Sequence, residues 1–200
     1  MRVLGCVRIA KEYSDGELER LIRHGIKRDD TSTWIMPAPM FSYLTDDDLG
    51  SIIAYVRSVP AVDGVERELT IRPLGRIGIV ARKFQPVAMH VPADDKRDAP
   101  DRADPMSHGK YLVMTACTEC HGARLEGSDV VKAPSLMVAA AYSKDDFARL
   151  MRTGVGVGDR HLGLMTKAAQ GRFASLTTEE IDAVRTYLEA FVKQGGTALP

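Results

Sequence analysis

The sequence lacks the features that mark several classes of protein. Its 200 residues contain no run near the roughly 18 apolar residues that a membrane-spanning helix needs. The three cysteines are too few for a disulfide framework. Neither sign of charge is in excess, because 27 Lys and Arg residues balance 27 Asp and Glu residues, and we therefore expect no nucleic-acid partner. The apolar content of 44% and the charged content of 27% instead predict globular domains.

We also predict no export signal in the first ten residues of this sequence. The first ten residues are partly apolar, but Arg2 and Arg8 interrupt them. A signal peptide needs about 7 to 15 uninterrupted apolar residues at its centre, so this segment does not qualify. The chain length fits one large domain or two small ones, and an internal repeat favours two.

The repeat consists of a tyrosine–serine pair, a glycine and a methionine that recur at a constant offset of 129. The first copy has Tyr13, Ser14, Gly25 and Met36, and the second has Tyr142, Ser143, Gly154 and Met165. After a three-residue insertion, the segments LTDDDLGSIIAYVRS and LTTEEIDAVRTYLEA match at an offset of 132. Each copy therefore predicts a helix, an irregular methionine loop and a second helix.

Capping residues support these helices. Ser14 and Ser143 precede acidic residues and an amphipathic stretch, which is typical of a helix N-terminus. Thr45 and Thr177 are each followed by an acidic residue three positions later and by apolar residues at helical spacing. The sequence therefore predicts an all-α fold.

The copies are joined by a segment with the composition of a linker, residues 61–106. Six prolines occur from Pro60 to Ser107, Pro60 included, and the stretch PADDKRDAPDRADP is polar with mixed charge. The preceding stretch RPLGRIGIVARKF is apolar and basic, so it either packs on a domain or forms an interface with a partner. The sequence leaves both interpretations open.

The stretch MTACTECHG contains Cys117, Cys120 and His121 in the C-x-x-C-H arrangement of c-type haem attachment. Two thiols three residues apart on one helical turn lie on the same side, where each can bond to the porphyrin, and the adjacent imidazole is carried beneath the iron. A zinc site would need two further ligands, and neither Cys6 nor the other histidines supply a matching pair. A thiol redox pair would be expected in a βαβ pattern, whereas these surroundings are helical.

With these residues the chain resembles the class I c-type cytochromes. Gly109 lies eight residues before Cys117, where that family has a glycine that packs against the C-terminal helix. Pro134 lies about a dozen residues after His121, where the family has a proline whose carbonyl accepts from the imidazole. The resemblance implies one complete cytochrome c domain over residues 107–194, with one haem c per chain bound by Cys117, Cys120 and His121.

The resemblance also implies a methionine as the second axial ligand, on the loop before the C-terminal helix. Met165 occupies that place, 44 residues after His121. His161, four residues earlier, is the main competitor, although a surface histidine is the simpler interpretation. Met137 and Met151 fall on helical or flanking stretches and are expected in the core.

The first copy, residues 1–60, resembles the methionine loop and final helix of a second cytochrome domain of the kind found in two-haem cytochromes. Its attachment motif would begin at position −12, which is before Met1, so Met36 has no haem within this sequence. Cys6 cannot substitute, because it lacks the second thiol and the histidine. We expect an N-terminal truncation that removed both this motif and an export signal; a one-haem protein with a scaffold half is the alternative.

A haem with nitrogen and thioether ligands has no open coordination site, so we predict a carrier of electrons and not an enzyme. The expected location is the periplasm, and the expected partners are redox proteins: a dehydrogenase, a terminal oxidase or another cytochrome. Peripheral membrane association is compatible with the sequence. The alternatives are a haem enzyme or ligand sensor with a displaceable sixth ligand, and a haem-free binding module.

Overall fold

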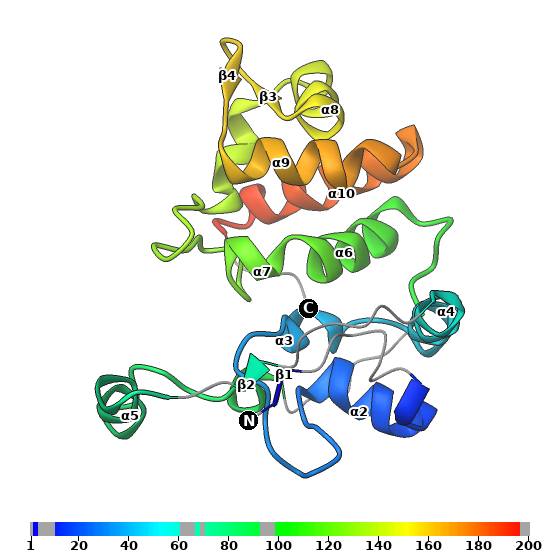
Figure 1. Ribbon diagram of the computed structural model, residues 1–200. Helices are drawn as coiled ribbons and strands as arrows, with labels where there is room; N and C mark the ends of the chain where they lie inside the picture. The colour runs from blue at the N-terminus through cyan, green and yellow to red at the C-terminus, as the bar shows by residue number, and fades with distance from the viewer. Residues whose placement is uncertain (1, 4–10, 61–66, 69–70, 93–98, 197–200) are drawn as a thin grey trace. The chain divides into compact units, whose positions relative to one another are not determined.

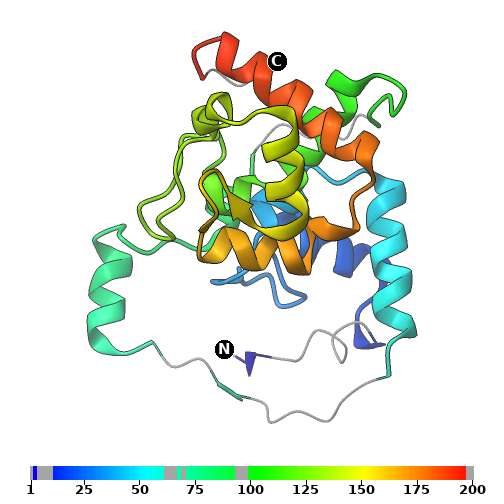
Figure 2. The same ribbon diagram turned by 90° about the horizontal axis from the view of Figure 1, so that it is seen from above.

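The computed structural model describes residues 2–3, 11–60, 67–68, 71–92 and 99–196 (Figures 1 and 2). The chain divides into two compact units, Met1–Asp98 (unit 1) and Ala99–Pro200 (unit 2). Both are built mainly from helices, and the described strands are two short antiparallel pairs, so the predicted all-α fold is confirmed. None of the described helices has the length and apolar composition needed to cross a bilayer.

Unit 1 is organised around two helices that share an apolar cluster. Its elements are β1 (Arg2–Val3), α2 (Asp15–His24), α3 (Ala38–Phe41), α4 (Asp46–Ser58), β2 (Arg67–Glu68), α5 (Pro73–Val80) and the 3-10 helix η1 (Val87–His90). Leu18 and Leu21 of α2 pack with Leu49 and Ile53 of α4. These positions are three and four residues apart, which places each pair on one side of its helix.

Ser14 caps the N-terminus of α2, as the sequence predicted, and a glycine ends the helix. The Ser14 side chain accepts from the backbone N–H of Glu17, and the Glu17 carboxylate accepts from the backbone N–H of Ser14. Gly25 ends the helix in the left-handed conformation, with φ 66°. An ion pair also joins α2 to α4, since the buried Arg23 side chain of α2 donates to the Asp46 carboxylate of α4 at 2.6 Å.

The stretch expected to be a linker contains two helical segments with different surroundings. No residue of α5 is buried, and Leu74, Ile77 and Val80 are exposed. By contrast, Val87 of η1 is buried, and its N–H donates to the carbonyl of Thr33 at 3.0 Å. The segment around Val87 therefore packs against the rest of unit 1.

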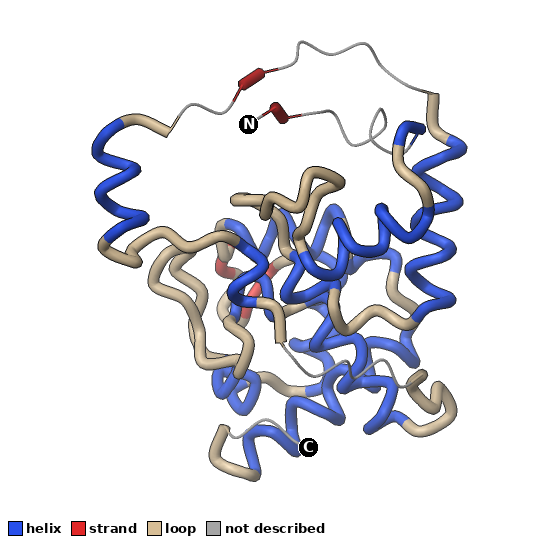
Figure 3. Tube along the Cα trace, turned by 90° about the horizontal axis from the view of Figure 1, so that it is seen from below, coloured by secondary structure: helices blue, strands red, loops and turns tan. Residues whose placement is uncertain are grey.

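Unit 2 contains most of the helices, which Figure 3 distinguishes from the loops by colour. Its elements are α6 (Pro105–Ala116), α7 (Thr118–His121), η2 (Leu136–Ala141), α8 (Lys144–Thr153), β3 (Val155–Gly156), β4 (Arg160–His161), α9 (Leu164–Gly171), η3 (Phe173–Ser175) and α10 (Thr178–Lys193). The strands β3 and β4 pair antiparallel. The core lies among α6, α8, α9 and α10.

The helices α6 and α10 pack side by side in unit 2 (Figure 1). At Gly109 they come so close that a Cβ atom would lie only 2.0 Å from the carbonyl oxygen of Ala183 and 3.1 Å from the Cβ of Tyr187. Only glycine allows this distance, because any other residue would bring its side chain into the backbone of α10. The crossing fixes α6 and therefore the position of the turn that follows it.

Two expectations about methionines in unit 2 need correction. The segment around Met165 was expected to be irregular, but it forms α9 after a glycine at φ 59°. The sequence LMTKAAQ consists mostly of good helix formers, which accounts for this helix. Met137 was expected in the core, but it lies on η2 with 37% of its surface exposed. The buried residue of this short helix is its neighbour Leu136, which faces the core in its place.

Candidate functional site

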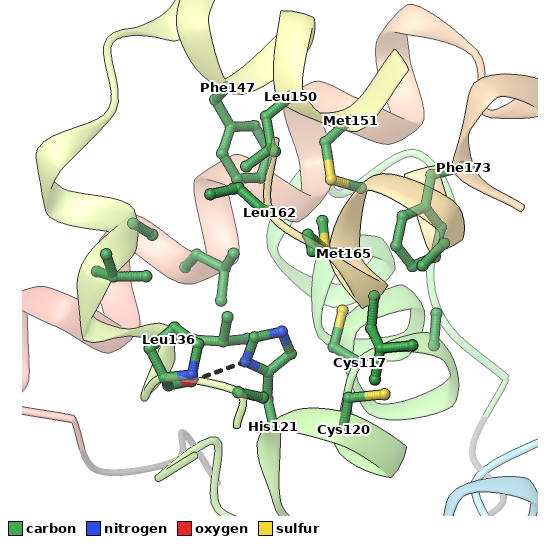
Figure 4. Close-up of a pocket in the computed structure, with 18 of the residues that line it drawn as sticks. Cys117, Cys120, His121, Leu136, Phe147, Leu150, Met151, Leu162, Met165 and Phe173 are labelled. Carbon is green, nitrogen blue, oxygen red and sulfur yellow. Dashed lines mark hydrogen bonds between the residues drawn. The ribbon is translucent and has the colours of Figure 1, made fainter. Parts of the chain in front are cut away.

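The three residues of the attachment motif lie on one tight turn. Cys117 ends α6 and begins α7, and its carbonyl accepts from the N–H groups of Cys120 at 3.2 Å and His121 at 2.9 Å. These bonds hold the motif in a helical conformation, so both thiols and the imidazole line the same pocket (Figure 4). The local sequence is sufficient to produce this arrangement.

The His121 ring is oriented by a backbone carbonyl. Its Nδ1 atom lies 2.8 Å from the carbonyl oxygen of Pro134, as the dashed line in Figure 4 marks. A carbonyl can only accept, so Nδ1 carries the proton and Nε2 is left with a lone pair. A nitrogen in this state can coordinate a metal ion, and the hydrogen bond to the Pro134 carbonyl fixes the plane of the ring.

A glycine allows the segment of Pro134 to come this close. Gly127 has φ 98°, and a Cβ atom there would lie 2.7 Å from the N of Ser135 and 2.8 Å from the O of Ala133. The N–H of Gly127 also donates to the carbonyl of His121 at 2.7 Å. Gly127 therefore ties the motif turn to the loop that orients its histidine.

The pocket encloses about 390 Å³ and has mainly apolar walls. Met165, in the first turn of α9, projects into it from a different element than His121 (Figure 4). A thioether and an imidazole thus enter one apolar cavity from different elements. The other large apolar side chains in the lining are Leu136, Phe147, Leu150, Met151, Leu162, Leu164, Phe173 and Leu188.

The charged residues of the pocket lie at its rim. Lys132, Arg160 and Arg172 line it while their side chains remain exposed. Arg172 also pairs with Glu119, between the two cysteines, at 3.3 Å. An apolar ligand that carries acidic groups would suit an apolar pocket with cationic side chains at its rim.

Burial favours the protonated form of both thiols in the protein without a bound ligand. Burial raises the pKa of Cys117 to about 12, and burial also raises that of Cys120. Thiol redox pairs have the opposite property, a lowered pKa that provides a thiolate. Among the described residues, no three His, Cys, Asp or Glu side chains are grouped so as to hold a metal ion.

The structure thus places Cys117, Cys120, His121, Pro134 and Met165 together. His161 is exposed on β4 and is not among the residues that line the pocket. In unit 1, Met36 packs against the apolar cluster of α2 and α4, whereas Cys6 lies outside the described residues.

Sequence reasoning missed most of the pocket wall. The helical spacing of Phe147, Leu150 and Met151 predicts a buried face on α8, but it does not show that this face lines a ligand cavity. Leu162 and Phe173 lie outside any periodic pattern, so they carried no signal.

Comparison with known proteins agrees with the geometry. Residues 106–191 match the family model described as Cytochrome c. The chain is 28% identical to the fructose dehydrogenase cytochrome subunit of Gluconobacter japonicus, over 89% of this chain and 41% of that protein. It is 23% identical to the gluconate 2-dehydrogenase cytochrome c subunit of Pantoea cypripedii, over 90% of this chain and 47% of that protein. The chain spans less than half the length of these relatives.

The cytochrome c family implies a covalently bound haem c, and the residues present fit that group. Two thiols and an imidazole with an open Nε2 line one apolar pocket, which a thioether enters from another element. The cationic rim suits the carboxylates at the edge of a haem. Residues 106–191 of this chain therefore form a domain of the cytochrome c family, as the resemblance of its sequence to the class I c-type cytochromes predicted.

Proposed function

We propose that this chain transfers electrons through one haem c per chain, as the cytochrome component of a dehydrogenase in the periplasm. The observation that carries the proposal is the His121–Pro134 bond of 2.8 Å in a pocket that Met165 also enters. The haem, when bound, supplies an iron that alternates between two oxidation states. The side chains around the iron determine whether a substrate can also bind to it.

Met165 and His121 favour electron transfer over catalysis. His121 would hold the iron through Nε2 and Met165 would hold it through its thioether sulfur, so no ligand site would stay open for a substrate. Cys117 and Cys120 would form the two thioether bonds. The apolar wall excludes water from the pocket, and a thioether ligand favours the reduced form of the iron.

The partner proposed is a dehydrogenase, because the two relatives described above are cytochrome subunits of a fructose dehydrogenase and a gluconate 2-dehydrogenase. A periplasmic location is proposed because c-type cytochromes receive their covalently attached haem in that compartment. The chain covers only part of each relative, so a longer polypeptide with further haems is compatible with this role.

The test is stopped-flow spectroscopy of protein matured in a host that exports and attaches haem. We expect full, reversible reduction and oxidation by small redox mediators, an absorption band of methionine-ligated ferric iron, and no binding of carbon monoxide to the reduced protein within seconds. Rapid carbon monoxide binding would instead assign a haem enzyme or ligand sensor. Recovery of a folded, colourless protein would assign a haem-free binding module.

A further inference from the structure

The helix that carries Met165 begins without a capping side chain. Gly163 precedes α9 with φ 59° and has no side chain that could accept from the first N–H groups of the helix. A side chain of the first turn closes this end instead. The Oγ1 atom of Thr166, the residue after Met165, accepts from the N–H of Leu162 at 2.8 Å. The first turn of α9 is therefore joined to the residue before the glycine.

The same hydroxyl joins α9 to the end of α8. It donates to the carbonyl oxygen of Gly154 at 2.7 Å, so the Thr166 hydroxyl both donates and accepts. Gly154 ends α8 with φ 73°, and a Cβ atom there would lie only 2.5 Å from the Cα of Thr166. The close approach that this glycine permits brings its carbonyl within reach of the hydroxyl.

The hydroxyl bridge lies beside the methionine but outside the pocket. Met165 lines the pocket (Figure 4), whereas Thr166 is not among the residues that line it. Leu162 connects the two, because its carbonyl accepts from the N–H of Met165 at 3.2 Å while its own N–H donates to Thr166. The bridge therefore restricts the backbone on both sides of Met165.

The first copy of the repeat provides a partner for the corresponding carbonyl in another way. Gly25 is the counterpart of Gly154, and its carbonyl accepts from the backbone N–H of Thr33 at 2.7 Å. The residue after Met36 is Pro37, which has neither a hydroxyl nor an N–H to donate. The hydroxyl bridge thus belongs to the copy that also contains the attachment motif.

We propose that Thr166 is a positioning residue for Met165. Its hydroxyl, held between the Leu162 N–H and the Gly154 carbonyl, fixes the start of α9 and with it the direction in which the thioether enters the pocket. This inference rests on the proposed function, in which Met165 holds the iron. A ligand that is already held in place loses less entropy on binding, so the bridge favours Met165 over a competing ligand from solution.

Competition with imidazole tests the proposal in the full-length holoprotein, matured in a host that exports the chain and attaches haem. Titration of the ferric protein measures the affinity for imidazole as the methionine-to-iron absorption band is lost. Thr166→Val removes the hydroxyl and keeps the size of the side chain, whereas Thr166→Ser keeps the hydroxyl. Thr186→Val is the matched control, because the Thr186 hydroxyl donates to the carbonyl of Asp182 at 2.8 Å within α10 and Thr186 is not among the residues that line the pocket.

We expect Thr166→Val to raise the affinity for imidazole about tenfold, since it removes both hydrogen bonds of the hydroxyl. Thr166→Ser and Thr186→Val should stay within about twofold of the parent protein. Hydrogen exchange followed by mass spectrometry gives a second readout. In Thr166→Val the amides of residues 162–171 should exchange faster, while the amides of α10 keep the rates of the parent protein.

Three results would overturn the proposal while leaving the methionine ligand in place. The first is an unchanged imidazole affinity in Thr166→Val. The second is an equal rise in Thr166→Ser, because the hydroxyl would then not be the cause. The third is equally faster exchange in α10, which would assign the bridge to the stability of unit 2 as a whole.

Failure of the proposed function would look different. The parent protein itself would then lack the methionine-to-iron band, and Met165→Ala would bind imidazole with the affinity of the parent. That result would overturn the role of Thr166 together with the role of Met165.

Discussion

The Nδ1 atom of His121 and the carbonyl oxygen of Pro134 lie 2.8 Å apart, although 13 residues separate them in the chain. The bond assigns the proton to Nδ1 and leaves Nε2 with a lone pair that can coordinate a metal ion. It depends on the close approach at Gly127, where the backbone of residues 133–135 leaves no space for a Cβ atom. The geometry of the histidine therefore rests on a glycine outside the attachment motif.

Gly127→Ala should displace Pro134 from His121. We expect a loss of about 1–3 kcal/mol in the free energy of unfolding, with an altered NMR signal for the His121 Nδ1 proton. Gly158→Ala is the matched control, because Gly158 also has a positive φ but has no atom within 4 Å of the added Cβ. It should lose stability through backbone strain alone, about 1 kcal/mol, and keep the proton signal. An unchanged His121 proton signal in Gly127→Ala would show that the His121–Pro134 hydrogen bond does not depend on Gly127.

Met165→Ala should open the sixth coordination position. The reduced holoprotein is then expected to bind carbon monoxide rapidly, to lose the methionine-to-iron band and to have a lower reduction potential. Met137→Ala serves as the control, since Met137 is 37% exposed and is not among the residues that line the pocket. If Met165→Ala kept the spectrum of the parent protein, another residue would be the ligand.

Gly109→Ala should destabilise unit 2, because its Cβ would lie 2.0 Å from the carbonyl oxygen of Ala183. We expect a loss of about 3 kcal/mol, measured as faster hydrogen exchange of the α10 amides. Gly171→Ala, at the end of α9 with no atom within 4 Å, should change stability by about 0.5 kcal/mol or less. Equal effects of the two substitutions would argue against the close crossing of α6 and α10.

Glu17 should make the stability of unit 1 depend on pH. Its hydrogen bond with Arg28 lowers the pKa of this carboxylate from 4.5 to about 2. Because the folded pKa is the lower one, the stabilisation is fully present above pH 4.5 and is lost as the pH falls toward 2. Glu17→Gln should therefore speed exchange of the α2 amides at pH 6 and make little difference near pH 2. A difference between the two proteins that persists at pH 2 would contradict this account.

The parts of the site that the sequence predicts are those set by local geometry. Cys117, Cys120 and His121 lie on one turn, so their spacing alone places them together. The capping of α2, α4, α8 and α10 is equally local. Pro134 and Met165 were assigned through family resemblance, because the contacts that bring them to His121 join distant parts of the chain.

Other features depend on tertiary packing and had no local signal. The burial of Val87 results from its contact with Thr33, 54 positions earlier, and proline-rich composition does not encode such a contact. The helix α9 was missed because its flanking glycines suggested a loop, whereas its own residues favour a helix. The exposure of Tyr55 could not be predicted either, since the repeat equates it with the buried Tyr187.

The most direct test of the central claim is the mass of the intact protein after denaturation, following maturation in an exporting host. The account predicts one haem covalently attached to the peptide that contains Cys117 and Cys120, with neither thiol available for alkylation. Weaker or absent covalent attachment of the haem in Cys117→Ala and in Cys120→Ala would assign one thioether bond to each cysteine. An unmodified mass, with both thiols free to react in protein that was properly exported, would contradict the account.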